Sequence, residues 1–238
     1  QQRLNNGGTE TVNVLHIADG KLTKMFSLSE VYYREDFLSR QEENPEILMQ
    51  EPLQQGTSWA LPDGRTCTIT AVDVPVSTPS GEYAAIEITT QSADATGGII
   101  TNYYARGVGL VKSIFKEGEM EISSSLAKIE KDVPLTQMVE FFWPNIESEK
   151  IYYKAIPVQF YTNDSTAERL TEAYKTNPIP QTGAVFTANT QINKLYLGEN
   201  AMVHLDLNKA FLGEMNAGAG YEAMILQSIA NTFGQYYG

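Results

Sequence analysis

The chain has 238 residues, of which 42% are hydrophobic, and a formal net charge of -12 from 17 basic and 29 acidic residues. Because domains usually contain about 100 to 200 residues, this length favours two domains over a single large one. The acidic balance excludes nucleic acid as a partner and disfavours anionic membrane surfaces, since both require clustered Lys and Arg.

The first ten residues are almost entirely polar. Residues 1–10 contain one apolar side chain, Leu4, and two adjacent glycines. Such a composition predicts a flexible tether, of the kind that remains when an export signal has been removed. No stretch of about 18 apolar residues follows, so the sequence predicts no membrane-spanning helix.

Residues 11–133 carry the signals of an antiparallel sheet. A tight hairpin is expected at Asp19-Gly20, because this turn pair lies between two alternating runs. Further alternating runs, separated by Gly- and Pro-containing turns, predict about eight strands in all. The hairpin at Asp19-Gly20 spans residues 12–26, and the clearest further runs span 66–76, 82–91, 102–115 and 119–129.

Residues 27–43 fit two structures. Ser27 and Glu30 have the spacing of a capping box at the start of a helix. Residues 30–37, which include two tyrosines and a valine, are equally typical of a strand. Both interpretations remain open at this point.

Residues 134–238 combine strands with two helices. Ser165 and Glu168 form a capping box that predicts a helix over 165–177, and a second helix is expected from about Gly220 to Tyr236. The second helix carries an apolar stripe at a spacing of four residues. Strands are expected at 138–143 and 156–162, and a hairpin at 195–207. The predicted fold class is therefore two domains, mainly antiparallel β over 11–133 and α+β over 134–238.

A glycine-rich stretch, A-G-A-G-Y-E-A at residues 217–223, has the G-x-G-x-x-A spacing of dinucleotide-binding loops. Such a loop directly follows a strand, whereas here the preceding strand is expected to end near Leu207. Glu214 and Glu222 also place negative charge where a phosphate would bind. We therefore expect no nucleotide and no other cofactor. The glycines are instead expected to bring the first turn of a helix close to its sheet.

His204 and Asp206 lie two residues apart on a predicted strand and so share one face of it. A histidine beside a carboxylate begins a hydrolytic triad or a metal site, and a hydrolase built on this pair is one hypothesis for function. The favoured interpretation is a solvent-facing strand with no catalytic residue, because the chain has only two histidines and none of the common hydrolase or zinc motifs. Scattered acids such as Asp94 and Glu214 form no calcium-binding loop, so no metal is expected.

Aromatic side chains are the candidate interaction residues, because they anchor interfaces at low entropic cost. The competing interpretation is that most of them pack in the core. Trp59 and Tyr104 also define an alternative function, in which aromatics line a small-ligand pocket in the first domain. The candidates are Trp59, Trp143 and the pairs Tyr103-Tyr104 and Tyr152-Tyr153.

The order of motifs in residues 134–238 resembles the GerMN domain of bacterial sporulation and germination proteins. That domain has a V-x-V-D-L-s-x-x-F strand and turn, followed by a helix ending in T-L-x-x-F/Y. The first motif is matched by Val203, Leu205, Asp206, Leu207 and Phe211, and the second by Ile229, Thr232, Phe233 and Tyr236. The resemblance implies an α+β domain without catalytic residues.

The first half is similar to a β-rich domain of exported bacterial lipoproteins. The shared motifs are G-T-S-W-A-L-P-D-G at 56–64, T-P-S-G-E-Y at 78–83 and Y-Y-A-R-G-V-G-L-V-K at 103–112. Together the two resemblances imply a non-enzymatic lipoprotein on the extracytoplasmic face of the cell membrane, held by an N-terminal lipid anchor. They imply protein partners in the membrane or the spore envelope, and an assembly role in sporulation or germination.

Overall fold

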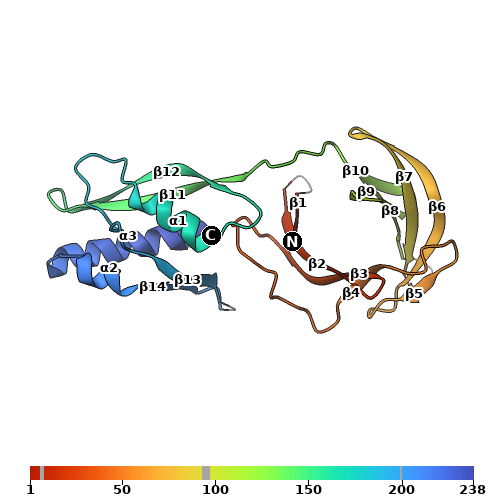
Figure 1. The fold of residues 1–238 in the computed structure, drawn as a ribbon, viewed down its shortest axis with the longest axis horizontal. Helices are drawn as coiled ribbons and strands as arrows, with labels where there is room; N and C mark the ends of the chain where they lie inside the picture. The colour runs from red at the N-terminus through yellow and green to blue at the C-terminus, as the bar shows by residue number, and fades with distance from the viewer. Residues whose placement is uncertain (6–7, 93–96, 199) are drawn as a thin grey trace. The chain divides into compact units, whose positions relative to one another are not determined.

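The structure is a computed structural model that describes residues 1–5, 8–92, 97–198 and 200–238. It consists of two compact units (Figure 1). The N-terminal unit contains Gln1–Glu30 and Phe37–Lys131, and the C-terminal unit contains Val31–Asp36 and Asp132–Gly238. The N-terminal unit is antiparallel β and the C-terminal unit combines strands with helices, which confirms the predicted fold class.

Two antiparallel sheets form the N-terminal unit. One has the order β1-β2-β3-β4 and the other the order β10-β9-β8-β7-β6-β5. The larger sheet carries a core of Trp59, Ile69, Ile88 and Tyr104. The strands are β1 (Gln2–Asn5), β2 (Glu10–Ala18), β3 (Lys21–Ser29), β4 (Glu46–Gln50), β5 (Ser58–Ala60), β6 (Thr66–Thr78), β7 (Gly81–Gln91), β8 (Ile99–Ala105), β9 (Gly109–Glu117) and β10 (Met120–Ser125).

The expected hairpin turns are present. Asp19 and Gly20 both have positive φ, 51° and 69°, and join β2 to β3 as an Asp-Gly turn should. The prediction of one strand over 102–115 was wrong, because the chain reverses at Gly107 and the run divides into β8 and β9. Gly107 has a φ of 75°, which permits the reversal within an otherwise alternating sequence.

The first residues of the chain differ from the predicted tether. Gln2–Asn5 form β1, which pairs with β2, and Glu10 already belongs to β2. The polar composition of this segment suits an edge strand, because the side chains on one face of such a strand contact water.

Of residues 27–43, which fitted both a helix and a strand, 27–29 belong to β3 and the remainder forms neither. After β3 ends at Ser29, residues 31–36 run without regular structure and pack on the C-terminal unit. The guanidinium of Arg34 lies 5.4 Å from the ring centroid of Phe160 and donates a hydrogen bond to Thr166. The hydroxyl of Tyr236 in turn donates to the carbonyl oxygen of Arg34.

The C-terminal unit has three layers, a β11–β12 hairpin, the long helices and a β13–β14 hairpin (Figure 1). The helices share one core with the strands, centred on Trp143, Tyr174, Phe186 and Phe233. The elements are β11 (Leu135–Asn145), β12 (Lys150–Phe160), α1 (Thr166–Lys175), β13 (Ile192–Leu197), β14 (Val203–Leu207), α2 (Lys209–Glu214) and α3 (Ala219–Tyr237).

Both predicted helices are confirmed. α1 begins after Ser165, whose side-chain oxygen accepts a hydrogen bond from the amide of Glu168 at 3.3 Å. α3 buries Ile225, Ile229 and Phe233 against the hairpin layers. No helix among the described residues combines the length and the apolar content needed to cross a membrane.

Gly183 is required by a close approach of Tyr221. A Cβ atom at Gly183 would lie 1.3 Å from the hydroxyl oxygen of Tyr221. We expect Gly183→Ala to lower the free energy of unfolding of this unit by about 1 to 3 kcal/mol, the usual cost of overpacking. Chemical denaturation measures the loss, and the double variant Gly183→Ala/Tyr221→Phe should recover part of it. Equal stability of the double and single variants would contradict the steric explanation.

Candidate interaction site

The aromatic candidates from the sequence lie mostly in the core. Trp143 is 0% exposed, and Trp59 and Tyr104 are also buried. The indole N–H of Trp59 donates to the carbonyl oxygen of Ile47 at 2.9 Å, which fixes the ring inside its unit. Tyr103 is half-buried, and burial raises the pKa of its hydroxyl. In this structure Trp59, Tyr104 and Trp143 are therefore not presented to a partner.

His204 and Asp206 are exposed on β14, as the alternation predicts. The imidazole stacks on Tyr196, with ring centroids 4.8 Å apart, and Asp206 accepts a hydrogen bond from Asn193. Within the part of the chain that the structure describes, no hydrogen bond joins His204 to Asp206, a hydroxyl or a thiol. A Cβ atom at Gly198 would lie 2.8 Å from Nε2 of His204, so the loop backbone approaches this nitrogen closely.

The glycine-rich stretch begins α3, with Gly218 as its N-cap residue. Cβ atoms at Gly218 and Gly220 would meet nothing within 4 Å, so these glycines do not bring the helix close to a sheet as expected. Among the carboxylates considered for calcium, Asp94 lies outside the described residues and Glu214 binds the amide of Asn189 at 2.7 Å. The described ranges contain no group of three metal-ligating side chains.

The N-terminal unit has a polar cleft of about 380 Å³. It contains the ion pairs of Glu46 with Lys24 and Arg65, and of Arg65 with Asp63. Neither Trp59 nor Tyr104 lines this cleft, and both are buried in the core of the unit.

The outer face of the β11–β12 hairpin is partly exposed and largely apolar, with Glu140 between Met138 and Phe142. Met138 is 63% and Tyr153 58% exposed, and the ring of Tyr153 packs on Phe142 at a centroid distance of 5.3 Å. The opposite face of the same hairpin buries Val139, Phe141 and Trp143. The sheet is therefore covered on one face by its helices and carries an aromatic surface on the other.

Other elements of the unit bind main-chain groups on the free edge of β11. The amide of Phe142 donates to Oγ1 of Thr232 at 3.1 Å, and the hydroxyl of Tyr174 donates to the carbonyl oxygen of Phe142 at 2.7 Å. Two residues further along, the carbonyl oxygen of Pro144 accepts from the amide of Gly183. These contacts satisfy the outward main-chain groups of Phe142 and the carbonyl of Pro144, which could otherwise pair with another strand.

The free edge of β12 is open over residues 151–155. Tyr153 lies opposite Phe142, whose amide and carbonyl are both bound by side chains, so the two residues form a non-hydrogen-bonded pair. The amide and carbonyl of Tyr153 therefore point away from β11. Because the pattern alternates, those of Ile151 and Ala155 do the same. No hydrogen bond to another described residue occupies these outward groups.

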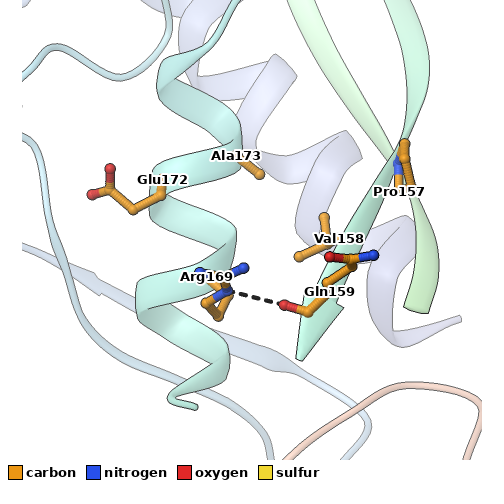
Figure 2. A pocket seen from close by; sticks show the side chains of 6 residues that line it. All are labelled: Pro157, Val158, Gln159, Arg169, Glu172 and Ala173. Carbon is orange, nitrogen blue, oxygen red and sulfur yellow. Dashed lines mark hydrogen bonds between the residues drawn. The ribbon is translucent and has the colours of Figure 1, made fainter. Parts of the chain in front are cut away.

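One end of this edge is closed beside α1. Pro157 has no amide hydrogen, and Nε of Arg169 donates to the carbonyl oxygen of Gln159 at 3.0 Å (Figure 2). A shallow cleft of about 410 Å³ lies here between β12 and α1, lined by Pro157, Gln159 and Glu172 among others. The open edge thus extends from the end of the hairpin loop to Pro157.

A comparison with protein-family models finds a match within the C-terminal unit. Residues 140–238 match the Germane family model, which is described as sporulation and spore germination. After this match we call residues 140–238 the Germane domain. The match confirms the resemblance of the C-terminal half to sporulation and germination proteins, and it indicates a role related to those processes. No curated protein and no solved structure matches the chain.

Sequence reasoning found part of the exposed surface of the Germane domain. Tyr152 and Tyr153 were candidates, and they are 40% and 58% exposed. Met138 and Phe142 were not among the candidates. They alternate along β11 with the buried Val139, Phe141 and Trp143 and so lie on its other face. A strict inside–outside assignment of this strand would have placed both on the outer face.

Proposed function

We propose that this protein is a non-enzymatic, extracytoplasmic lipoprotein that acts as a protein-interaction module in sporulation or spore germination. The process follows from the Germane domain at residues 140–238. The observation that favours an interaction role is the outer face of the β11–β12 hairpin, where Met138 and Tyr153 are exposed and the half-buried Phe142 packs on Tyr153. Aromatic residues and Met are enriched in the cores of protein interfaces, where they are buried on binding.

The expected partners are proteins of the membrane or the spore envelope. The lipoprotein assignment and the N-terminal lipid anchor rest on the likeness of the first half to exported lipoproteins. The acidic charge of -12 is consistent with attachment through a lipid and not through electrostatic contact with an anionic membrane.

The outer face can be tested without disturbing the core. In the source cell we expect Met138→Ser/Tyr153→Ser to lower the number of spores formed or the fraction that germinates, because partner affinity should fall about tenfold or more. Met202→Ser/Tyr161→Ser is the matched control, since these side chains are 56% and 50% exposed elsewhere on the Germane domain. Immunoblots verify that all variants accumulate to the same level.

Normal spore formation and germination in the outer-face variant would overturn the proposal. The hydrolase hypothesis is separated by His204→Ala, which we expect to leave both processes unchanged. A defect in that variant, with the fold intact, would favour catalysis at His204 instead.

A further inference from the structure

We propose that residues 151–155 of β12 bind an extended, acidic segment of a partner protein as an added β-strand. This inference rests on the proposed interaction role and names the chemistry that the site accepts. Main-chain hydrogen bonds supply much of the affinity when a peptide extends a sheet in this way, and side chains beside the edge supply the specificity.

β12 exposes a short stretch of main chain that can pair with another strand. Ile151, Tyr153 and Ala155 each direct one amide donor and one carbonyl acceptor outward, on the argument from the Phe142–Tyr153 pair. Pro157 lacks a donor, and Arg169 already occupies the carbonyl of Gln159. On β11 the outward groups of Phe142 and the carbonyl of Pro144 are bound by Thr232, Tyr174 and Gly183, whereas those of Ile151, Tyr153 and Ala155 on β12 have no hydrogen-bond partner among the described residues.

The charge along this edge is basic. Lys150 and Lys154 are both exposed and lie on the same face of β12, because they are four residues apart. Neither forms an ion pair with any described residue. Two lysines without an ion-pair partner beside an open edge favour carboxylates on the incoming strand.

The other face of the edge is apolar. Tyr153 points to the side opposite the lysines and packs on Phe142. A matching strand therefore alternates, with acidic side chains toward Lys150 and Lys154 and apolar side chains beside Tyr153.

A second copy of this chain fits the edge less well. Antiparallel pairing of two β12 edges about Tyr153 would make the two copies of Lys154 diagonal neighbours on one face. Like charges at that range repel. Charge thus favours an acidic partner over self-pairing.

The probe is a fluorescein-labelled ten-residue peptide of alternating glutamate and valine, with blocked ends. We expect it to bind the full chain in low salt, as measured by fluorescence anisotropy, and to release as salt is added. Lys150→Gln/Lys154→Gln should weaken binding about fivefold. Lys194→Gln, an exposed lysine on β13, is the matched control and should change nothing.

Hydrogen exchange then locates the bound peptide. Saturating peptide should slow exchange at the amides of Ile151, Tyr153 and Ala155. The inference is overturned by unchanged exchange at these amides up to about 1 mM peptide, by equal binding of a lysine–valine peptide, or by equal binding to the double-lysine variant. Slowed exchange that depends on protein concentration and not on peptide would assign the edge to a second copy and also overturn it.

The two proposals fail separately. If the peptide binds as expected but the outer-face variant sporulates and germinates normally, the proposed function fails and the edge chemistry stands. If the outer-face variant is defective but the edge of β12 does not bind the peptide, only the inference of an acidic added strand fails.

Discussion

Replacing Tyr174 by alanine is expected to lower the free energy of unfolding of the Germane domain by about 3 to 5 kcal/mol, the usual cost of deleting a large core ring. Tyr174 is 1% exposed. Its ring contacts Phe141, Trp143 and Phe186, with centroids 4.8 to 5.7 Å away. For a domain of about a hundred residues, a loss of this size lowers the melting temperature by more than about 10 °C.

The hydroxyl of Tyr174 can be examined apart from the ring. It donates to the carbonyl oxygen of Phe142 and accepts a hydrogen bond from Thr232 at 3.0 Å. Tyr174→Phe should therefore cost about 1 to 3 kcal/mol, because it leaves a buried carbonyl without its donor. Trp143 is the fluorescent reporter of this unit, in a Trp59→Phe background that removes the only other tryptophan.

Tyr161→Phe is the control for the hydroxyl, because Tyr161 is half-exposed and its loss should change stability by less than about 0.5 kcal/mol. If Tyr174→Phe were as stable as the parent chain, the edge of β11 would not depend on this hydrogen bond. The explanation for why β11 is closed would then be wrong.

The sequence predicted those elements whose signals are local. Ser165 and Glu168 lie three residues apart, and Asp19-Gly20 form the turn themselves, so each signal lies within the structure it specifies. The apolar stripe of α3 likewise predicted which side of the helix is buried. The turn at Gly107 was missed because a single glycine inside an alternating run fits both a strand and a reversal.

Long-range contacts were beyond prediction. Arg34 precedes its partners Phe160, Thr166 and Tyr236 by more than a hundred residues, and nothing in its neighbourhood indicates them. Residue type alone also could not separate Trp143, which is buried, from Tyr153, which is exposed, because aromatic side chains suit cores and interfaces equally. The open edge of β12 became visible only when the partners of Phe142 were known.

Alkaline pH is expected to destabilise the Germane domain through the same tyrosine. Burial raises the pKa of Tyr174 in the folded state, while the unfolded chain keeps the ordinary value of about 10. Below pH 10 the phenol is protonated in both states, so its contribution to stability is fully present. Above pH 10 only the unfolded state loses the proton. Stability then falls by about 1.4 kcal/mol per pH unit for this group.

Tyr174→Phe removes this dependence, so the variant and the parent should converge as pH rises. The stability difference is expected to be about 1 to 3 kcal/mol near pH 8 and to shrink steadily above pH 10. Burial also raises the pKa of Tyr237, which leaves a residual slope in both proteins. Urea denaturation at closely spaced pH values, followed through Trp143, measures the two curves.

Tyr104 provides the matched control in the other unit, because burial raises the pKa of its hydroxyl as well. In a Trp143→Phe background, Tyr104→Phe should reduce the alkaline slope seen through Trp59, which packs in the same core as Tyr104. In the Trp59→Phe background it should leave the slope seen through Trp143 unchanged. Parallel curves for Tyr174→Phe and its parent would show that the phenol ionises as readily in the folded domain as in the unfolded chain. Tyr174 would then be accessible to water in solution, and the closed edge of β11 would have to open with it.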